Sequence, residues 1–271
     1  MAFRVVENPL RTFWASTDGS STYYVGQLVA YNAASKAAMA GTVVPLAVPA
    51  GAADATNYQV IAGIVVGINN RTAVSNSTGQ YATGVVTQAA QLARDWAFQE
   101  GMYVKGDPQV LVQVMEISPN TVIEGNIYNA ALGTAPTVVT DTAGTDATGY
   151  TSAGTTGACD FTPVADVCTI YCRSGKNAGL YRTSHDTSTT APQTVVGFPN
   201  DVALGDKFVR VPLKQGLSHI YIAGPGLYID CSKTAATNTF QVLVYELNLE
   251  NAGKETAQFR FTSPHFDYAR A

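Results

Sequence analysis

Short runs in which apolar and polar residues alternate recur along much of the chain. In the run from Val110 to Ile117, Val112 and Val114 fall on one face of an extended strand, and their immediate neighbours fall on the other face. Phe240 to Leu249 and Gln258 to Thr262 alternate in the same way. A period of two is typical of half-buried strands, so the pattern predicts a mainly β protein with few short helices.

A second kind of run is apolar nearly throughout. Tyr58 to Ile68 includes Gly63 and Gly67, which favours a central strand with a bulge or a close approach of another backbone. Val85 to Phe98 is open to two interpretations, a short helix or a strand pair around Trp96. The other candidate strands are short and are bounded by turn residues: Tyr23 to Tyr31, Gly41 to Val48, Gly101 to Gly106, Thr121 to Tyr128, Val167 to Cys172, Thr194 to Phe198, Lys207 to Leu213, Ile220 to Ile222 and Leu227 to Cys231.

Composition divides the chain into four parts. Residues 1–22 lack a sustained period and end in a polar turn, so we expect an N-terminal arm. Residues 23–132 carry the first block of strands and are predicted to form a β-barrel-like domain. Residues 133–160 are rich in Gly, Thr and Ala and can bury little apolar surface, which predicts a linker or long loop. Residues 161–271 hold short strands with frequent turns, which predicts an antiparallel β-sandwich with an aromatic C-terminal tail.

The chain is poor in charge. Charged residues make up 13% of it, about half the usual share for a soluble domain. A free monomer normally depends on a charged surface for solubility, so this composition suggests that partner proteins cover part of the surface. The formal net charge of −4 argues against nucleic acid as a partner, because phosphate binding needs a clustered surplus of Lys and Arg.

The sequence also bears on the cellular compartment. No apolar run approaches the roughly 18 residues that a membrane-spanning helix needs, so no membrane partner is expected. Residues 1–9 lack the basic start and the apolar stretch of a signal peptide. We therefore expect a protein that is made in a cytoplasm and is not exported by that route.

Sequence motifs for catalysis are not found. The chain has no Gly-x-Ser-x-Gly elbow, no His-Glu-x-x-His pair and no phosphate loop. His185 lies in a Ser- and Thr-rich segment, where a solvated histidine is favoured over a general base. Cys168 and Cys172 could form half of a zinc site, but Cys159 and Cys231 supply no second close pair, so buried reduced thiols are favoured. We expect no enzymatic activity, no metal and no cofactor.

Apolar and aromatic residues gather near both ends of the chain, where polar residues are usual. They either dock onto their own domain as its last strands or anchor the chain to a neighbouring subunit, where aromatic residues and Arg are favoured. On the second interpretation, we expect removal of residues 1–14 to leave the fold intact. The candidate contact residues are Arg4, Arg11, Phe13, Trp14, Phe259, Phe261, Phe266 and Tyr268.

Two stretches carry a resemblance to a known family. Residues 26–29 followed by 61–67 are similar to the opening strands of small β-barrel head proteins of tailed bacteriophages, and residues 101–104 with 110–112 are similar to their later strands. With its low charge and its Ala-, Gly- and Thr-rich composition, the chain resembles capsid decoration, or cement, proteins. The resemblance implies a non-enzymatic protein of the virion, located on the capsid surface and assembled in the host cytoplasm. It also implies that a dimer or trimer clamps neighbouring major capsid protein subunits.

Two other functions stay open at this point. A fibre-tip or carbohydrate-binding module is the main alternative, because Tyr221, Tyr228 and Tyr245 could line a sugar-binding groove. Cross-strand pairs or core positions are nevertheless favoured for tyrosines in strands. The major capsid protein itself is less favoured, since the sequence shows neither a long spine helix nor a long charged extended loop.

Overall fold

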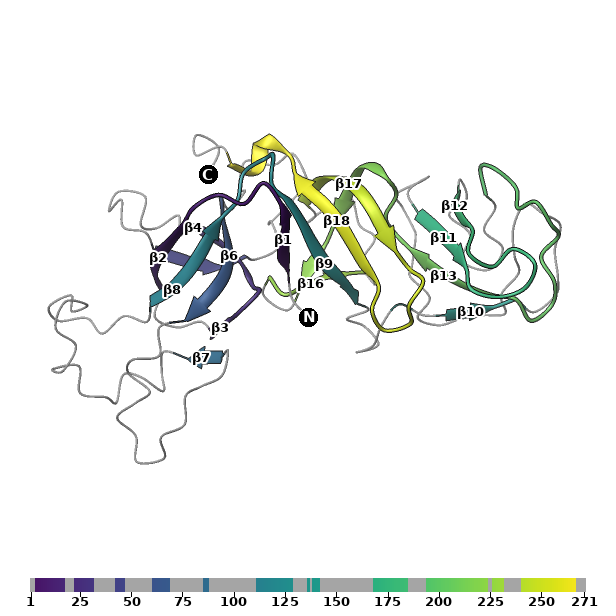
Figure 1. Ribbon diagram of the computed structural model, residues 1–271, viewed down its shortest axis with the longest axis horizontal. Helices are drawn as coiled ribbons and strands as arrows, with labels where there is room; N and C mark the ends of the chain where they lie inside the picture. Colours follow the sequence, from purple (N-terminus) through teal and green to yellow (C-terminus); the bar gives the residue numbers. More distant parts are fainter. Residues whose placement is uncertain are drawn as a thin grey trace, which may run out of the picture.

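The computed structural model confirms a mainly β fold. It describes residues 3–17, 22–31, 42–46, 60–68, 85–87, 111–128, 136, 138–141, 168–184, 194–223, 226–231 and 240–266. Strands make up nearly all of the regular structure in these residues, and the short 3-10 helix η4 (Ser263–Phe266) follows the last strand. Figure 1 shows a barrel at the left, a large sheet in the middle and a smaller sheet at the right.

The barrel is a closed ring of five strands. Strands β2 and β5 pair in parallel, and the other four neighbouring pairs of the ring are antiparallel. In order around the ring, the strands are β2 (Thr12–Thr17), β5 (Thr42–Pro45), β4 (Leu28–Tyr31), β6 (Ile61–Ile68) and β8 (Leu111–Glu116). Val112 and Val114 are buried inside it, as their alternation predicts. Gly63 on β6 confirms the predicted close approach, because a Cβ there would collide with the carbonyl oxygen of Met115.

The large sheet brings together strands from both ends of the chain. Its order is β14 (Gly216–Ile220), β17 (Phe240–Asn248), β18 (Thr256–Phe261), β9 (Val122–Tyr128), β16 (Tyr228–Asp230) and β15 (Ile222–Ala223), and β1 (Arg4–Glu7) also pairs with β9. All of these pairs are antiparallel except β16 with β9.

Two smaller sheets complete the described structure. The four-stranded sheet has the order β10 (Val138–Thr140), β13 (Lys207–Val211), β11 (Cys168–Cys172) and β12 (Tyr181–Ser184). The two-stranded sheet pairs β3 (Thr22–Tyr24) with β7 (Val85–Thr87). Residues 85–87 are therefore extended, and the rest of the ambiguous run up to Phe98 lies outside the described residues, as does the candidate strand at 101–106. Residues 194–198, predicted as a strand, form only an isolated bridge at Thr194.

The sheets do not follow the predicted domain boundaries. Strand β9 belongs by sequence to the predicted barrel domain of residues 23–132, yet it pairs with β18 and β16 from the predicted sandwich of residues 161–271. One buried apolar cluster includes Leu28 of the barrel, Ile123 of β9 and Phe259 of β18. The predicted linker contributes β10, which pairs with β13, and most of its other residues lie outside the described ones.

The predicted N-terminal arm is wrong for the described residues 3–17, which we call the N-terminal segment. Its strand β1 pairs with β9 and its strand β2 pairs with β8. Between them, the side chain of Asn8 donates to the carbonyl oxygen of Asn120 at 3.1 Å. Backbone hydrogen bonds to β9 and β8 hold this segment in the fold. Removing residues 1–14 would therefore open the wall of the barrel.

Phe3 anchors the start of the N-terminal segment. Its ring is buried and packs edge-on against Phe259, with ring centres 6.2 Å apart, and its backbone N–H donates to the carbonyl oxygen of Gly26 at 2.8 Å. Gly125 of β9 makes room for this ring, because a Cβ at that position would overlap it. Phe3 therefore contacts both the barrel and the large sheet.

We expect Phe3→Ala to lower the free energy of unfolding by about 3–5 kcal/mol, because it empties a buried site shared by two sheets. Leu10→Ala is the matched control, since Leu10 is exposed and lies on the same segment. Its effect should stay within about 0.5 kcal/mol. Chemical denaturation of the two variants measures both, and equal effects would contradict the anchoring role of Phe3.

Candidate functional site

The two arginines predicted as N-terminal contacts are already paired. Arg4 lies 2.8 Å from Glu124, and Arg11 lies 2.8 Å from Glu116. Both arginine side chains are largely exposed. The hydrogen bond to Glu116 and its negative charge raise the pKa of Arg11 above its usual value. Because each charge is matched by a neighbour in the same chain, these arginines offer little attraction to a distant partner.

Trp14 is the most exposed aromatic side chain of the N-terminal segment. It is 53% exposed on the outer wall of the barrel, where its strand partner is Gln113 of β8, and Gln113 in turn pairs with Gly67 of β6. Phe13 points the other way and stacks on Tyr31 with ring centres 6.4 Å apart. Val6 and Leu10 are also exposed on this segment. Of the predicted N-terminal contacts, the structure therefore leaves Trp14 as the aromatic residue available to a partner.

The C-terminal aromatic residues mostly serve their own core. Phe259 and Phe261 on β18 are buried and pack edge-on against each other with ring centres 5.4 Å apart. Phe266 on η4 is partly buried against the same core. The interpretation as the last strand of their own domain thus holds for Phe259 and Phe261, since β18 lies between β17 and β9, and the subunit-contact prediction is wrong for them. Tyr268 lies outside the described residues.

The three tyrosines considered for a sugar-binding groove do not gather. Tyr245 lies on β17 with the guanidinium of Arg260 5.7 Å from its ring centre, and Tyr228 lies on β16 against Tyr128. Strands β18 and β9 separate β17 from β16 in the sheet. Tyr221 lies between β14 and β15, and its carbonyl oxygen accepts from the backbone N–H of Asp230 on β16 at 2.8 Å, so it is also separated from Tyr245. The described structure therefore does not assemble a groove from these residues.

A hollow of about 650 Å³ lies where the four-stranded sheet meets the large sheet. Its polar lining comes from β11, β12 and the segment before β14, and its apolar lining comes from β17 and the loop after β12. The lining residues are Thr169, Tyr181, Arg182, Thr183, Val195, Val196, Gln215 and Leu247. No sequence motif marks this site, because its residues come from five separate stretches. The adjacent valines between turn residues are the only local signal of it.

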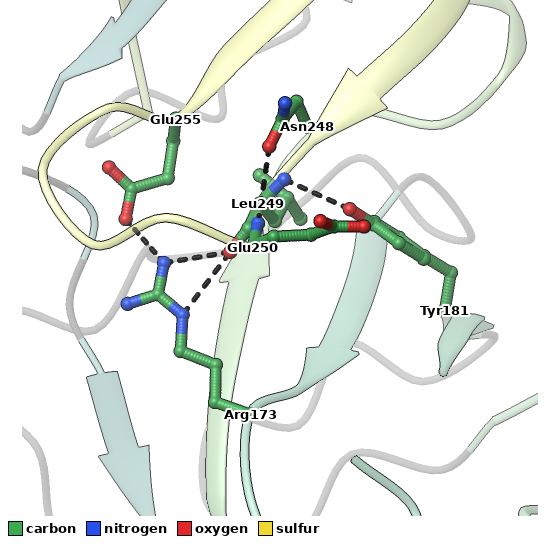
Figure 2. Close-up of polar contacts among 6 residues, drawn as sticks. All are labelled: Arg173, Tyr181, Asn248, Leu249, Glu250 and Glu255. Carbon is green, nitrogen blue, oxygen red and sulfur yellow. Dashed lines mark hydrogen bonds and ion pairs between the residues drawn. The ribbon is translucent and has the colours of Figure 1, made fainter. Parts of the chain in front are cut away.

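Polar contacts fix the junction beside this hollow (Figure 2). Arg173 follows β11, and its guanidinium lies 2.6 Å from Glu255 and donates two hydrogen bonds to the carbonyl oxygen of Leu249, at 2.8 and 3.2 Å. The backbone N–H of Leu249 donates to the hydroxyl of Tyr181 at 3.0 Å. Glu255 of the ion pair is buried at 1% exposure, and Arg173 is partly buried at 12%. The junction between the sheets is therefore held by hydrogen-bonded charges.

Other chemical groups in the described part of the chain show no arrangement for catalysis. The thiols of Cys168, Cys172 and Cys231 are buried, and burial raises the pKa of Cys172 to about 11, which keeps this thiol protonated and unreactive at neutral pH. Within the described ranges, no group of three or more His, Cys, Asp or Glu side chains could hold a metal ion. None of the helices described is long and apolar enough to cross a membrane.

Comparisons of the chain with models of protein families, with curated proteins and with solved structures found no match. Any functional inference therefore depends on the residues and contacts of this chain itself.

We expect Arg173→Met to lower the free energy of unfolding by about 3–5 kcal/mol, because it leaves the buried carboxylate of Glu255 without its counter-charge. Arg4→Met removes an ion pair of similar length at the surface and should change stability little. Urea denaturation of both variants tests this difference. A small effect of Arg173→Met would show that the ion pair does not fasten the junction.

His265 gives the fold a dependence on acid pH. Burial lowers its pKa to about 4, and its neutral ring accepts a hydrogen bond at Nε2 from the backbone N–H of Gln241 at 3.0 Å. Because the unfolded chain binds this proton near pH 6.5 and the folded chain only near pH 4, stability is full above pH 6.5 and falls as the pH drops toward 4.

The loss from His265 should reach at most about 1.4 kcal/mol per pH unit in this window. His265→Gln keeps a side-chain acceptor but cannot titrate there, so its stability should depend less on pH between 6.5 and 4. Thermal unfolding of both proteins across this range measures the difference. Parallel pH profiles would rule out His265 as the source.

Proposed function

We propose that the chain is a non-enzymatic structural protein of a tailed-bacteriophage virion, which binds the outside of the capsid shell and stabilises it by packing against major capsid protein subunits. The observation that carries this proposal is three exposed apolar side chains spaced along the N-terminal segment, Val6, Leu10 and Trp14, which we call the exposed row. Trp14 lies on β2, whose backbone is paired with β8. Rigid presentation of apolar side chains favours binding, because little conformational entropy is lost on docking.

The charges around this row support a docking role of the same kind. Arg4 and Arg11 are paired with carboxylates of the same chain, so covering them does not leave a cation without a partner. Tryptophan is among the residues that most often dominate interface energies. The sparse charge of the whole chain, 13% of residues, also suits a protein whose surface is covered in an assembly.

Packing area is the proposed mechanism. An interface of the standard size, about 1,600 Å² in total, repeated by the symmetry of a shell, braces neighbouring subunits without any chemical step. A dimer or trimer of the chain would span several subunits at once and add the benefit of multivalent binding.

The direct test of the proposal is mass spectrometry of purified virions. The chain should be present at a fixed copy number relative to the major capsid protein, because symmetry repeats its site. Its absence from virions, or its presence only in traces, would contradict the proposal.

Trp14→Ala tests the exposed row. On virion shells stripped of the chain, we expect the variant to bind at least about tenfold more weakly than the wild-type protein, since a central tryptophan typically contributes this much or more. Leu204→Ala is the control, because Leu204 is an equally apolar and exposed residue in a turn before β13. Quantitative co-sedimentation measures binding, and equal occupancy by both variants would exclude Trp14 from the interface.

A further inference from the structure

Arg182 lines the hollow between the four-stranded sheet and the large sheet, and no carboxylate among the described residues forms an ion pair with it. It takes part in none of the three ion pairs found among the described residues. Backbone carbonyls hold it instead: Nε donates to Gly197 at 3.0 Å and Nη1 donates to Tyr181 at 2.8 Å. A guanidinium has five N–H groups, and these bonds use two, so the others are available to a ligand within the described structure.

The guanidinium of Arg182 is also fixed in place. Its central carbon lies 5.3 Å from the ring centre of Phe198, which is buried against the core. Contact with an aromatic face and two backbone hydrogen bonds restrict the side chain to one position. An arginine ordered in this way loses little entropy when it binds a carboxylate, and a bidentate pair of this kind is among the stronger polar contacts in proteins.

Neutral polar groups lie near this cation. The hydroxyl of Tyr181 accepts from the backbone of Leu249, and burial raises its pKa, so its own proton stays available for donation at neutral pH. The side chain of Gln215 donates to the carbonyl oxygen of Tyr245 at 3.2 Å, which leaves its amide oxygen to accept another hydrogen bond. The hydroxyl of Tyr181 can donate to a C=O group of a peptide backbone, and the amide oxygen of Gln215 can accept from one of its N–H groups.

The remaining lining is aliphatic. Val195 and Val196 are 61% and 65% exposed, and Leu247, which is buried, also lines the hollow. Two adjacent valines at this exposure are unusual beside a cation, and they form an apolar wall for an occupant. A sugar would favour an open aromatic face, whereas the ring of Tyr181 packs against Tyr171 with ring centres 4.6 Å apart.

The geometry points to this hollow as the binding site for an extended, acidic and aliphatic peptide segment of a partner subunit. A carboxylate of the segment pairs with Arg182, and an aliphatic side chain packs on Val195 and Val196. This inference rests on the proposed function, because it names the chemistry by which a neighbouring subunit is recognised. The volume of about 650 Å³ lies within the range of sites that enclose small ligands.

Fluorescence anisotropy with a capped, labelled peptide tests the site on the full chain. The probe alternates valine and threonine around one central glutamate, and its analogue has glutamine in place of the glutamate. We expect the wild-type protein to bind the glutamate peptide at least about tenfold more tightly than the analogue. Arg182→Gln should remove this preference, whereas Lys176→Gln, which removes an exposed cation of the same sheet region, should retain it.

Val196→Glu is a second variant that does not disturb the core, because Val196 is exposed. Its carboxylate would lie on the wall of the hollow beside Arg182 and should weaken binding of the glutamate peptide about tenfold or more. Equal binding of the glutamate and glutamine peptides by the wild-type protein would overturn the inference. Binding of an oligouronic acid that depends on Arg182, with no binding of the peptide, would overturn the peptide as occupant.

Shell binding separates this inference from the proposed function. If the peptide does not bind but the wild-type chain coats stripped virion shells in a Trp14-dependent manner, only the assignment of the hollow fails. If the peptide binds with the expected dependence on Arg182 and the chain is absent from virions, the capsid role fails and the hollow stands as a peptide site.

Discussion

Strand β9 is hydrogen-bonded along both of its edges, and the arrangement of the other sheets depends on this pairing. One edge pairs with β18 from the C-terminal part of the chain, and the other pairs with β1 and β16. The turn that precedes β9 connects it directly to β8 of the barrel, and the hydroxyl of Thr121 in that turn donates to the carbonyl oxygen of Asn8. Residues from both chain ends and from the middle therefore enclose one core, in which Phe3 contacts Phe259.

This shared core explains why the exposed residues are held rigidly. A side chain on a strand that is paired and packed on its other face keeps a fixed direction, as Trp14 does opposite the inward-facing Phe13. At the other end of the large sheet, the ion pair of Arg173 and Glu255 fixes the four-stranded sheet against the turn between β17 and β18. The two candidate contact regions thus lie on parts of one folded unit, and Figure 1 shows the barrel and the four-stranded sheet at its opposite ends.

The sequence predicted what depends on local periodicity. The alternation around Val112 and Val114 identified β8 and its inward face, and Gly63 correctly marked a close approach of two backbones. Pairing across the chain leaves no such local signal, so the sequence alone predicts β1 as part of an arm and a domain boundary between partners of one sheet. An aromatic residue near a chain end has the same local pattern whether it fills the core, as Phe261 does, or faces solvent, as Trp14 does.

The arginines differ in a way that no sequence pattern reveals, and the difference bears on how a partner would be recognised. Arg4 and Arg11 form ion pairs with carboxylates, which largely cancel the electric field of each arginine at a distance. A partner that docks beside them would therefore bind mainly through buried apolar area. Within the described part of the chain, Arg182 is held by carbonyl dipoles and a ring, which orient the guanidinium without cancelling its charge. On the proposed function, the row around Trp14 would supply affinity, and Arg182 would supply selectivity for an acidic partner, because an uncompensated charge penalises every partner that lacks a carboxylate at that position.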